Sequence, residues 1–353
     1  MLSSRTPDLP RPRAAALAAL LALLALAQLG GPARATLAPN PFGTAPAPPS
    51  ANPLAGARWF VDSQWGLAAR QARAWSGSHP DWARTMEKLA AQPEAKRFGG
   101  FTADVQRTVR AFLVRAAQQG PGTVPILVIY RLKHVRCGRY GDSYGERLAY
   151  RRWIDAFARA VGGYRALIFL EPDALITVGC LSGSGLRTRI GELRYAGAKL
   201  AALPHGVVYL DAGAADALSA GYAAHLLRMA GVARLNGFFL NATHYDWTGD
   251  ELRYGNAISR RVGLKHFVIS TAVNGNGPLV PSSRVRYGNE VLCNPPGRAL
   301  GTPPTTNTGS PLADAYMWIG DPGRSSGPCH PGDPPNGSWF PRYALGLAER
   351  AHF

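Results

Sequence analysis

The chain has 353 residues, of which 46% are hydrophobic and 17% charged, so it can bury a large core and is not a disordered chain. Its 40 Gly and 29 Pro fit an α/β fold with long, shaped loops better than a helical bundle, because both residues interrupt helices. Lys and Arg outnumber Asp and Glu by 39 to 22, and the resulting net charge of +17 favours an anionic partner.

Residues 1–35 have the features of a secretory signal peptide. Three Arg residues precede an apolar stretch over 14–29, and the Ala-Arg-Ala sequence over 33–35 supplies the small residues at which a signal peptidase cuts. The apolar stretch is shorter than the roughly 20 residues that a membrane-spanning helix needs, and no later stretch could span either. We therefore expect a secreted, extracellular protein with no transmembrane segment, associated in some cases with the cell envelope. Without this leader, which holds four Arg and one Asp, the net charge is +14.

Residues 36–52 are rich in Pro, Ala and Ser and carry no charge, which predicts an extended tether. A single folded domain is expected over residues 53–353. Within it, short apolar runs alternate with helix-like segments such as 151–161 and 215–230, and the runs predict strands over 124–130, 166–170, 207–210, 238–240, 267–270 and 315–319. Runs of this kind are typical of parallel strands that are buried on both faces and joined by crossover helices.

Polar residues follow several of these predicted strands. Asp173 comes shortly after one, Asp211 directly after the next, and Asn241 after the third. In a β/α barrel the carboxyl ends of the strands form one rim, where active sites lie, so we expect these side chains to share a cleft. For an isolated Asp the alternative is a helix N-cap.

The four cysteines of the chain are expected to form two disulfides, because an exported protein folds in an oxidising compartment. No CxxC pair is present, which makes a zinc site improbable. Pairing of sequence neighbours closes the shortest loops, although spacing alone leaves all three pairings open. The cysteines are Cys137, Cys180, Cys293 and Cys329.

Six segments of the chain carry a family resemblance. They are EPDAL over 171–175, VYLDAG over 208–213, YGNAIS over 254–259, NGNGP over 274–278, CNPPGRALGTPPTTNTG over 293–309 and WFPRYALGLA over 339–348. In these segments the chain resembles the family 6 glycoside hydrolases, which are endoglucanases and cellobiohydrolases that cleave β-1,4-glucan with inversion. The resemblance implies a distorted, TIM-like parallel β/α barrel of about seven strands with its cleft at their carboxyl ends. It also implies pairing of each cysteine with its sequence neighbour, and no metal or organic cofactor.

The resemblance assigns roles to individual residues. An inverting glycosidase needs an acid that protonates the departing oxygen and a base that takes a proton from water on the other face of the sugar. Asp173 matches the family's proton donor, Asp211 a supporting carboxylate, and Tyr130 the tyrosine beside the distorted sugar ring. The residues expected to bind substrate are Tyr130, Arg136, Asn241, Tyr245, Asn274, Asn294, Arg298 and Trp318.

Other parts of the family pattern are missing. Arg136 stands where the family has an Asp that helps to hold the water, and Ser326 stands where it has the Asp usually proposed as base. A serine hydroxyl does not act as a base near neutral pH without its own activator. The nearby family Lys and Glu are Gly320 and Arg324. The family's aromatic platforms and a histidine after Asp211 are also absent from residues 214–220, so we expect altered or weak activity.

Three carboxylates are candidates to replace the base, although each would by default lie on the surface. They are Asp142, Asp216 and Asp321. Asp142 is the best of them, because its loop matches the family's mobile active-site loop. Trp65 and Trp247 are possible replacement platforms for sugar stacking, as is Trp318, which fits a core position equally well.

Basic residues crowd the segment over 131–152, either as a solvated face or as a site for an anionic partner. Because Arg136 matches a position that points into the family's site, we expect an anionic polymer at or near the glycan. We expect no nucleic acid, since the protein is expected to be secreted. Two functions remain. The first is a monomeric, secreted β-1,4-glucan hydrolase with a relocated base, and the alternative is a non-hydrolytic glycan-binding protein on the same scaffold.

Overall fold

The structure, a computed structural model, describes residues 51–132, 143–280 and 292–353. Its centre is a parallel sheet of seven strands, whose spatial order follows the order along the chain. The strands are β2 (Lys96–Gly99), β4 (Ile126–Tyr130), β5 (Ala166–Leu170), β6 (Gly206–Asp211), β7 (Gly237–Leu240), β8 (His266–Ser270) and β9 (Ala313–Met317). A separate short pair is formed by β1 (Arg58–Trp59) and β3 (Thr123–Val124).

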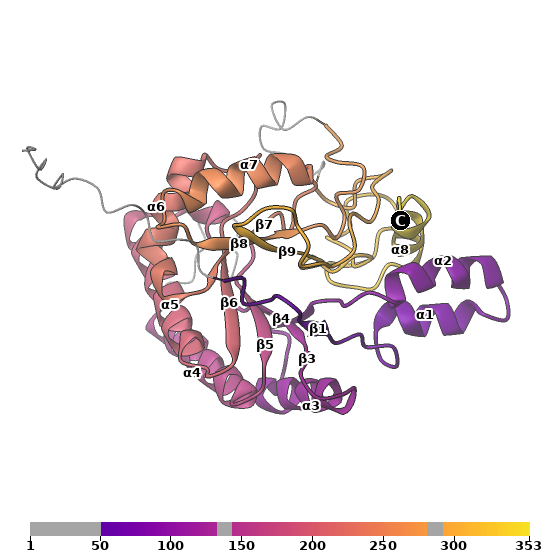
Figure 1. The fold of residues 1–353 in the computed structure, drawn as a ribbon, viewed down its shortest axis with the longest axis horizontal. Helices are drawn as coiled ribbons and strands as arrows, with labels where there is room; N and C mark the ends of the chain where they lie inside the picture. The colour runs from indigo at the N-terminus through magenta and orange to yellow at the C-terminus, as the bar shows by residue number, and fades with distance from the viewer. Residues whose placement is uncertain (1–50, 133–142, 281–291) are drawn as a thin grey trace, which may run out of the picture. The chain divides into compact units, whose positions relative to one another are not determined.

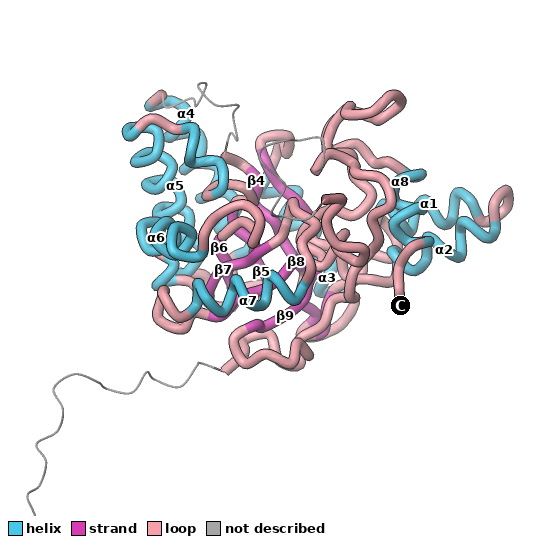
Figure 2. The backbone as a smooth tube through the Cα atoms, turned by 90° about the horizontal axis from the view of Figure 1, so that it is seen from above, coloured by secondary structure: helices cyan, strands magenta, loops and turns pink. Residues whose placement is uncertain are grey.

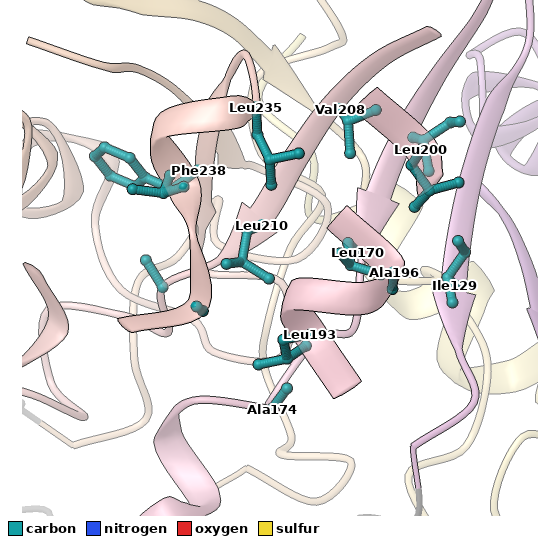
Figure 3. Packing of buried hydrophobic residues seen from close by; sticks show 14 of the residues in the cluster. Ile129, Leu170, Ala174, Leu193, Ala196, Leu200, Val208, Leu210, Leu235 and Phe238 are labelled. Atoms are coloured by element: carbon teal, nitrogen blue, oxygen red, sulfur yellow. The ribbon is translucent and has the colours of Figure 1, made fainter. Parts of the chain in front are cut away.

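Both faces of the seven-stranded sheet are buried. Side chains alternate along each strand, so that in β5 Ile168 and Leu170 belong to one apolar cluster while Leu167 and Phe169 belong to another. The first cluster packs the sheet against the surrounding helices, as Figure 3 shows for Leu170 and Leu210 beside Leu193 of α5 (Gly183–Ala201). The second cluster collects residues from β4 to β9 on the opposite face, where a curled sheet encloses its own side chains.

The sheet curls into a distorted, incompletely closed barrel. No ladder joins the edge strands β2 and β9 among the residues that the structure describes. A single backbone hydrogen bond instead connects the two edges, from the Ala95 amide to the Trp318 carbonyl at 3.4 Å. The predicted distorted, TIM-like parallel barrel with about seven strands is confirmed.

Helices surround the sheet. Helices α4 to α6 run along one side, and the α1/α2 hairpin lies beside α8 on the other (Figures 1 and 2). Apart from α5, their bounds are α1 (Leu67–Trp75), α2 (Pro80–Ala90), α3 (Val105–Gln118), α4 (Tyr144–Val161), α6 (Ala220–Ala230), α7 (Thr248–Ser259) and α8 (Pro341–Glu349). Across the described part of the chain, none of the helices has the length and apolar character to cross a bilayer.

The predicted elements differ from the observed ones in several places, among them α4, which begins at Tyr144 rather than at residue 151. The apolar pattern misses β2, because only Phe98 and Gly99 of its four residues are buried. It places β9 two residues late, because the buried Asp314 interrupts the apolar run. Helix α6 begins five residues later than predicted, where the Ser219 hydroxyl accepts the Tyr222 amide as an N-cap.

One predicted disulfide lies within the described residues. Cys293 and Cys329 are joined, with their Cα atoms 6.1 Å apart, as the family resemblance implies. Cys180 is also disulfide-bonded, and its predicted partner, Cys137, lies outside the described residues. The Cys293–Cys329 bridge ties the segment after β8 to the segment after β9.

Candidate active site

Three residues assigned by sequence lie along one rim of the barrel. Tyr130 is the last residue of β4, Asp173 follows β5 by three residues, and Asp211 is the last residue of β6. Because β4, β5 and β6 are parallel neighbours in the sheet, these residues share its carboxyl edge. This edge is where β/α barrels place their chemistry.

The backbone after β5 is held in an unusual conformation. Glu171 and Asp173 have φ values of 55° and 68°, in a region that non-Gly residues rarely occupy. The Thr243 hydroxyl from the loop after β7 donates a 2.5 Å hydrogen bond to a carboxylate oxygen of Asp173, and the Asp173 carbonyl accepts the Thr177 hydroxyl at 2.8 Å. These bonds fix the direction of the half-buried Asp173 side chain at a cost in backbone strain, a combination found at active sites.

Glu171 anchors the segment that leaves β4. Its carboxylate is fully buried and accepts backbone amides from Arg131, at 3.0 and 3.1 Å, and from Leu132, at 3.0 Å. The predicted residues Arg136 and Asp142 belong to the continuation of this segment, and both lie outside the described residues. The signal for Glu171 in the sequence is its place beside Asp173 in the EPDAL motif, which by itself assigns it no role.

Asp211 is buried, and its burial favours the protonated carboxyl. Its side chain accepts the Gly213 amide at 3.2 Å, while its other oxygen is enclosed without a hydrogen-bond partner. Burial and the nearby Asp173 raise the pKa of Asp211 to about 8, although backbone amides and His244 oppose the shift. Asp211 therefore holds a proton near neutral pH, next to Asp173 at the rim.

Tyr130 carries a cation above its ring. The Arg97 guanidinium lies 4.9 Å from the ring centroid and also pairs with Asp321 at 3.3 Å. Burial and then the charge of Asp173 raise the pKa of the Tyr130 hydroxyl to about 12, so the phenol stays neutral. A neutral phenol beside the acid can donate a hydrogen bond to a sugar oxygen.

A His–Asp pair lies at the same rim. The Nδ1 atom of His244, from the loop after β7, is 2.7 Å from a carboxylate oxygen of Asp216, from the segment after β6. Their side chains are only 9% and 4% exposed, so the expectation that Asp216 lies on the surface is wrong. The segment over 214–220 has no imidazole of its own, but the neighbouring loop brings one against it. The sequence gives little signal of this contact, because it depends on the register of two loops.

Two more buried acids, Asp246 and Glu251, lie near this pair. Burial, together with Asp216, raises the pKa of Asp246 to about 6, and burial raises that of Glu251 well above its ordinary value. One Glu251 oxygen accepts the Ala215 amide at 2.9 Å and the other is enclosed without a hydrogen-bond partner. Even so, no group of three or more His, Cys, Asp or Glu side chains in the described ranges has the arrangement of a metal site.

A pocket lies next to Tyr130, on the side of β2. It is bordered by the first turn of α1, the segment before β2 and the segment after β9, with Trp65, Trp339 and Arg97 among its lining. Asp173 and Asp211 do not line it, but the Arg97 side chain connects it to Tyr130. Aromatic faces beside charged groups can bind a sugar ring by stacking and hydrogen bonds.

The family follows from comparison of the whole chain. The model of "Glycosyl hydrolases family 6" matches residues 54–351. The chain is a member of this family. Endoglucanase A of Cellulomonas fimi is 37% identical over 284 residues, which are 80% of this chain and 59% of that protein. Endoglucanase 1 of Streptomyces halstedii is 31% identical over 304 residues, covering 82% of this chain and 88% of that one.

A solved structure of the family gives the same result. The endoglucanase Cel6 from Mycobacterium tuberculosis, in complex with methyl-cellobiosyl-4-deoxy-4-thio-β-D-cellobioside, superposes with a TM-score of 0.76 at 38% identity, covering 85% of this chain and 99% of that chain. By contrast, the chain spans about three fifths of the length of the endoglucanases A from Cellulomonas fimi and Thermobispora bispora.

In this family 6 member, three asparagine side chains bind the protein itself. Asn241 donates to the carbonyls of Asp246 and Ser270, both at 3.1 Å, and Asn274 donates to the Asp246 carbonyl at 2.9 Å. The Asn294 amide contacts three oxygens at 2.8 to 3.1 Å, and its own oxygen accepts the Ser326 amide. All three are buried. They position the loops of the rim, and their amides are not free for the sugar contacts that we expected.

The other expected substrate contacts lie in different surroundings. Trp318 is fully buried and donates to the Thr302 carbonyl at 3.1 Å, which places it in the core rather than on a sugar platform. The Tyr245 hydroxyl lies 3.3 Å from that of Tyr343. Arg298 donates to the Asn276 and Gly277 carbonyls at 2.9 and 2.5 Å, which braces the loop after β8.

The candidates for a replacement base have different surroundings in the structure. Asp321 lies between Arg97 and Arg324, at 3.3 and 3.4 Å, so it is tied up in ion pairs. Ser326 is exposed, with its backbone amide bound to Asn294. Asp142 stays a prediction. Among the aromatic candidates, Trp65 and Trp247 are 56% and 51% exposed, which suits a stacking surface.

Proposed function

We propose that this family 6 member is a secreted β-1,4-glucan hydrolase that acts with inversion and slowly on unmodified glucan. The observation that carries the proposal is the placement of Tyr130, Asp173 and Asp211 at the ends of three neighbouring strands. The relatives named above are endoglucanases, which indicates the same substrate class. Glycosidic cleavage needs a protonated carboxyl, and Asp211, whose pKa is raised to about 8, keeps a proton beside Asp173 near neutral pH.

In the proposed reaction, Asp173 gives its proton to the glycosidic oxygen as the bond from that oxygen to the anomeric carbon breaks. Water attacks the anomeric carbon from the opposite face, which inverts the configuration, and its surplus proton passes to the surrounding water. Asp211 keeps its own proton near neutral pH and therefore adds no negative charge beside Asp173 when Asp173 has given up its proton. Tyr130 lies beside the acid, where its neutral hydroxyl can contact the distorted sugar.

The slow rate follows from the missing base. A positioned base typically contributes 10²–10⁴-fold to the rate. Ser326 stands at the family's base position, and Asp321 is held by two guanidinium groups. If Asp142 does not replace the base, cleavage of plain glucan should be slower than in ordinary family members by about this factor.

The proposed substrate carries, or lies next to, negative charge. Arg97 and Arg324 border the pocket beside Tyr130, and Asp321, which pairs with both, compensates only one of their two charges. Burial raises the pKa of the neighbouring Glu94 to about 8, which removes a negative charge from the pocket at neutral pH. The net charge of +17 acts in the same direction. Secretion is supported by the leader over 1–35 and by the Cys293–Cys329 disulfide.

The test compares Asp173→Asn with the parent protein on soluble β-glucan, with NMR of the anomeric signal as the measurement of product configuration. We expect initial α-anomer from the parent and at least about 10²-fold less turnover from the variant, which lacks the acid. Asp81→Asn is the matched control, because its exposed carboxylate lies on α2. Equal turnover by Asp173→Asn would contradict the assigned acid.

A different observation favours the alternative function, which is glycan binding without hydrolysis. The loss of the base to Ser326 favours a glycan-binding protein without turnover. If the parent binds β-glucan oligosaccharides by calorimetry but releases no reducing ends, the scaffold serves binding and the hydrolytic proposal is wrong.

A further inference from the structure

The Asp216–His244 pair is a buried contact between two loops of the rim, not a surface contact. Its two partners come from different loops and are almost completely buried at 2.7 Å. The Nδ1 atom of the ring is enclosed against an Asp216 carboxylate oxygen. The imidazole is therefore oriented by a buried carboxylate, as in catalytic His–Asp pairs.

The pair is connected to the acid through its sequence neighbour. Thr243, directly before His244, donates the 2.5 Å hydrogen bond to Asp173. Asp211, at the end of β6, precedes Asp216 by five residues on the segment that reaches His244. The same two loops thus hold both the acid pair and the imidazole.

We propose that Asp216 holds His244 as an imidazolium, and that this cation sets the pH range over which the Asp173–Asp211 pair keeps its catalytic proton. His244 is in this role a positioning residue for the acid. The catalytic part of the inference rests on the proposed function, but the charge state of His244 does not.

The electrostatics of the site support this role. Burial alone would lower the pKa of His244, but Asp216, followed by Asp173 and Asp246, raises it above the ordinary value. In the opposite direction, His244 lowers the pKa of Asp211, which burial and Asp173 raise to about 8. The acidic groups that face His244 come from the segments after β5, β6 and β7. Loss of the cation would leave the proton on the acid pair up to a higher pH.

A second buried pair in the same protein provides a matched control. His266 Nδ1 lies 2.7 Å from an Asp314 oxygen, and the two side chains are 4% and 1% exposed. This pair joins the first residue of β8 to β9, at the end of the sheet away from the carboxyl rim. His266→Gln therefore removes an equally buried imidazole without touching the acid.

The experiment measures the pH dependence of kcat/KM for the parent, His244→Gln and His266→Gln on soluble β-glucan. For His244→Gln we expect the alkaline limb to move to higher pH by about 0.5–1 unit. The limb of His266→Gln should coincide with that of the parent, even where its stability is lower. An alkaline limb in His244→Gln that does not move, or moves no more than in His266→Gln, would overturn the inference.

A second measurement does not depend on activity. NMR titration of the imidazole signals, with the His244 signal assigned in the parent by sequence-specific experiments, should give His244 a pKa above the ordinary 6.5. Asp216→Asn should lower this pKa. A parent value below 6.5 refutes the imidazolium whether or not Asp216→Asn folds. If the parent has no turnover but His244 titrates as expected, the proposed function is wrong while the imidazolium stands.

Discussion

Single residues decide how far this member can be returned to its family's pattern. Gly320 stands where the family usually has Lys, yet a β-carbon at Gly320 would lie 2.5 Å from the Ala242 carbonyl oxygen. Ser326, by contrast, is exposed and bound only through its backbone. Two loops therefore leave no room for a side chain at Gly320, while the position of Ser326 is open to a larger side chain.

These two positions should respond differently to substitution. Gly320→Ala should lower the free energy of unfolding by about 1–3 kcal/mol, because the loop after β7 must shift. Ser326→Asp should change it by no more than about 0.5 kcal/mol, as surface substitutions do. Denaturant unfolding of the two variants checks this. Equal losses would show that Ser326 is packed as tightly as Gly320.

At the scale of elements, the loops after β8 and β9 depend on each other. The Cys293–Cys329 disulfide closes a separation of 36 residues. Asn294, next to Cys293, donates to the Gly327 carbonyl at 2.9 Å and accepts the Ser326 amide at 2.8 Å. The covalent bridge and the asparagine thus hold the segment in which the family places its base.

Removal of this bridge should destabilise the domain. For a closed loop of this length the chain-entropy model gives roughly 4 kcal/mol, so Cys293→Ser combined with Cys329→Ser should lower the free energy of unfolding by up to this amount. Denaturant unfolding of the oxidised parent and the double variant measures the difference. Non-reducing peptide mapping provides the control, and a Cys137 peptide linked to Cys293 or Cys329 would contradict the pairing.

The strands that could be predicted from the sequence are those built from an uninterrupted run of buried apolar residues. β5 is predicted to the residue because all five of its side chains are buried. β2 is missed because exposed and charged positions begin it, and β9 is shifted because Asp314 has buried partners, Tyr209 and His266, from distant strands. The acid pair is found through its motifs. The Asp216–His244 contact is not, because it is made by tertiary packing between loops.

For the whole molecule, the buried acids determine how stability depends on pH. Burial raises the pKa values of Asp211 and Glu94 to about 8 and that of Asp246 to about 6, and it also raises the pKa of Glu251. In each case the folded protein holds a proton that the unfolded chain, with ordinary carboxyl pKa values near 4, has already released. The folded state then binds more protons than the unfolded state, so stability falls as pH rises between these values.

We therefore expect the melting temperature to be higher near pH 5 than near pH 8, because these carboxyls must ionise inside the protein, or stay protonated at a rising cost, as the pH increases.

Glu251→Gln is the variant that isolates one contribution, since a neutral amide retains the hydrogen bond from the Ala215 amide and has no proton to lose. Its melting temperature should decline less between pH 5 and pH 8 than that of the parent. Asp81→Asn, which removes an exposed carboxylate on α2, should leave the parent's slope unchanged. Calorimetry from pH 5 to pH 8 at constant ionic strength measures the melting temperatures of the parent and both variants. If the melting temperature of the parent rises steadily over this range, the buried acids are not protonated in the folded protein.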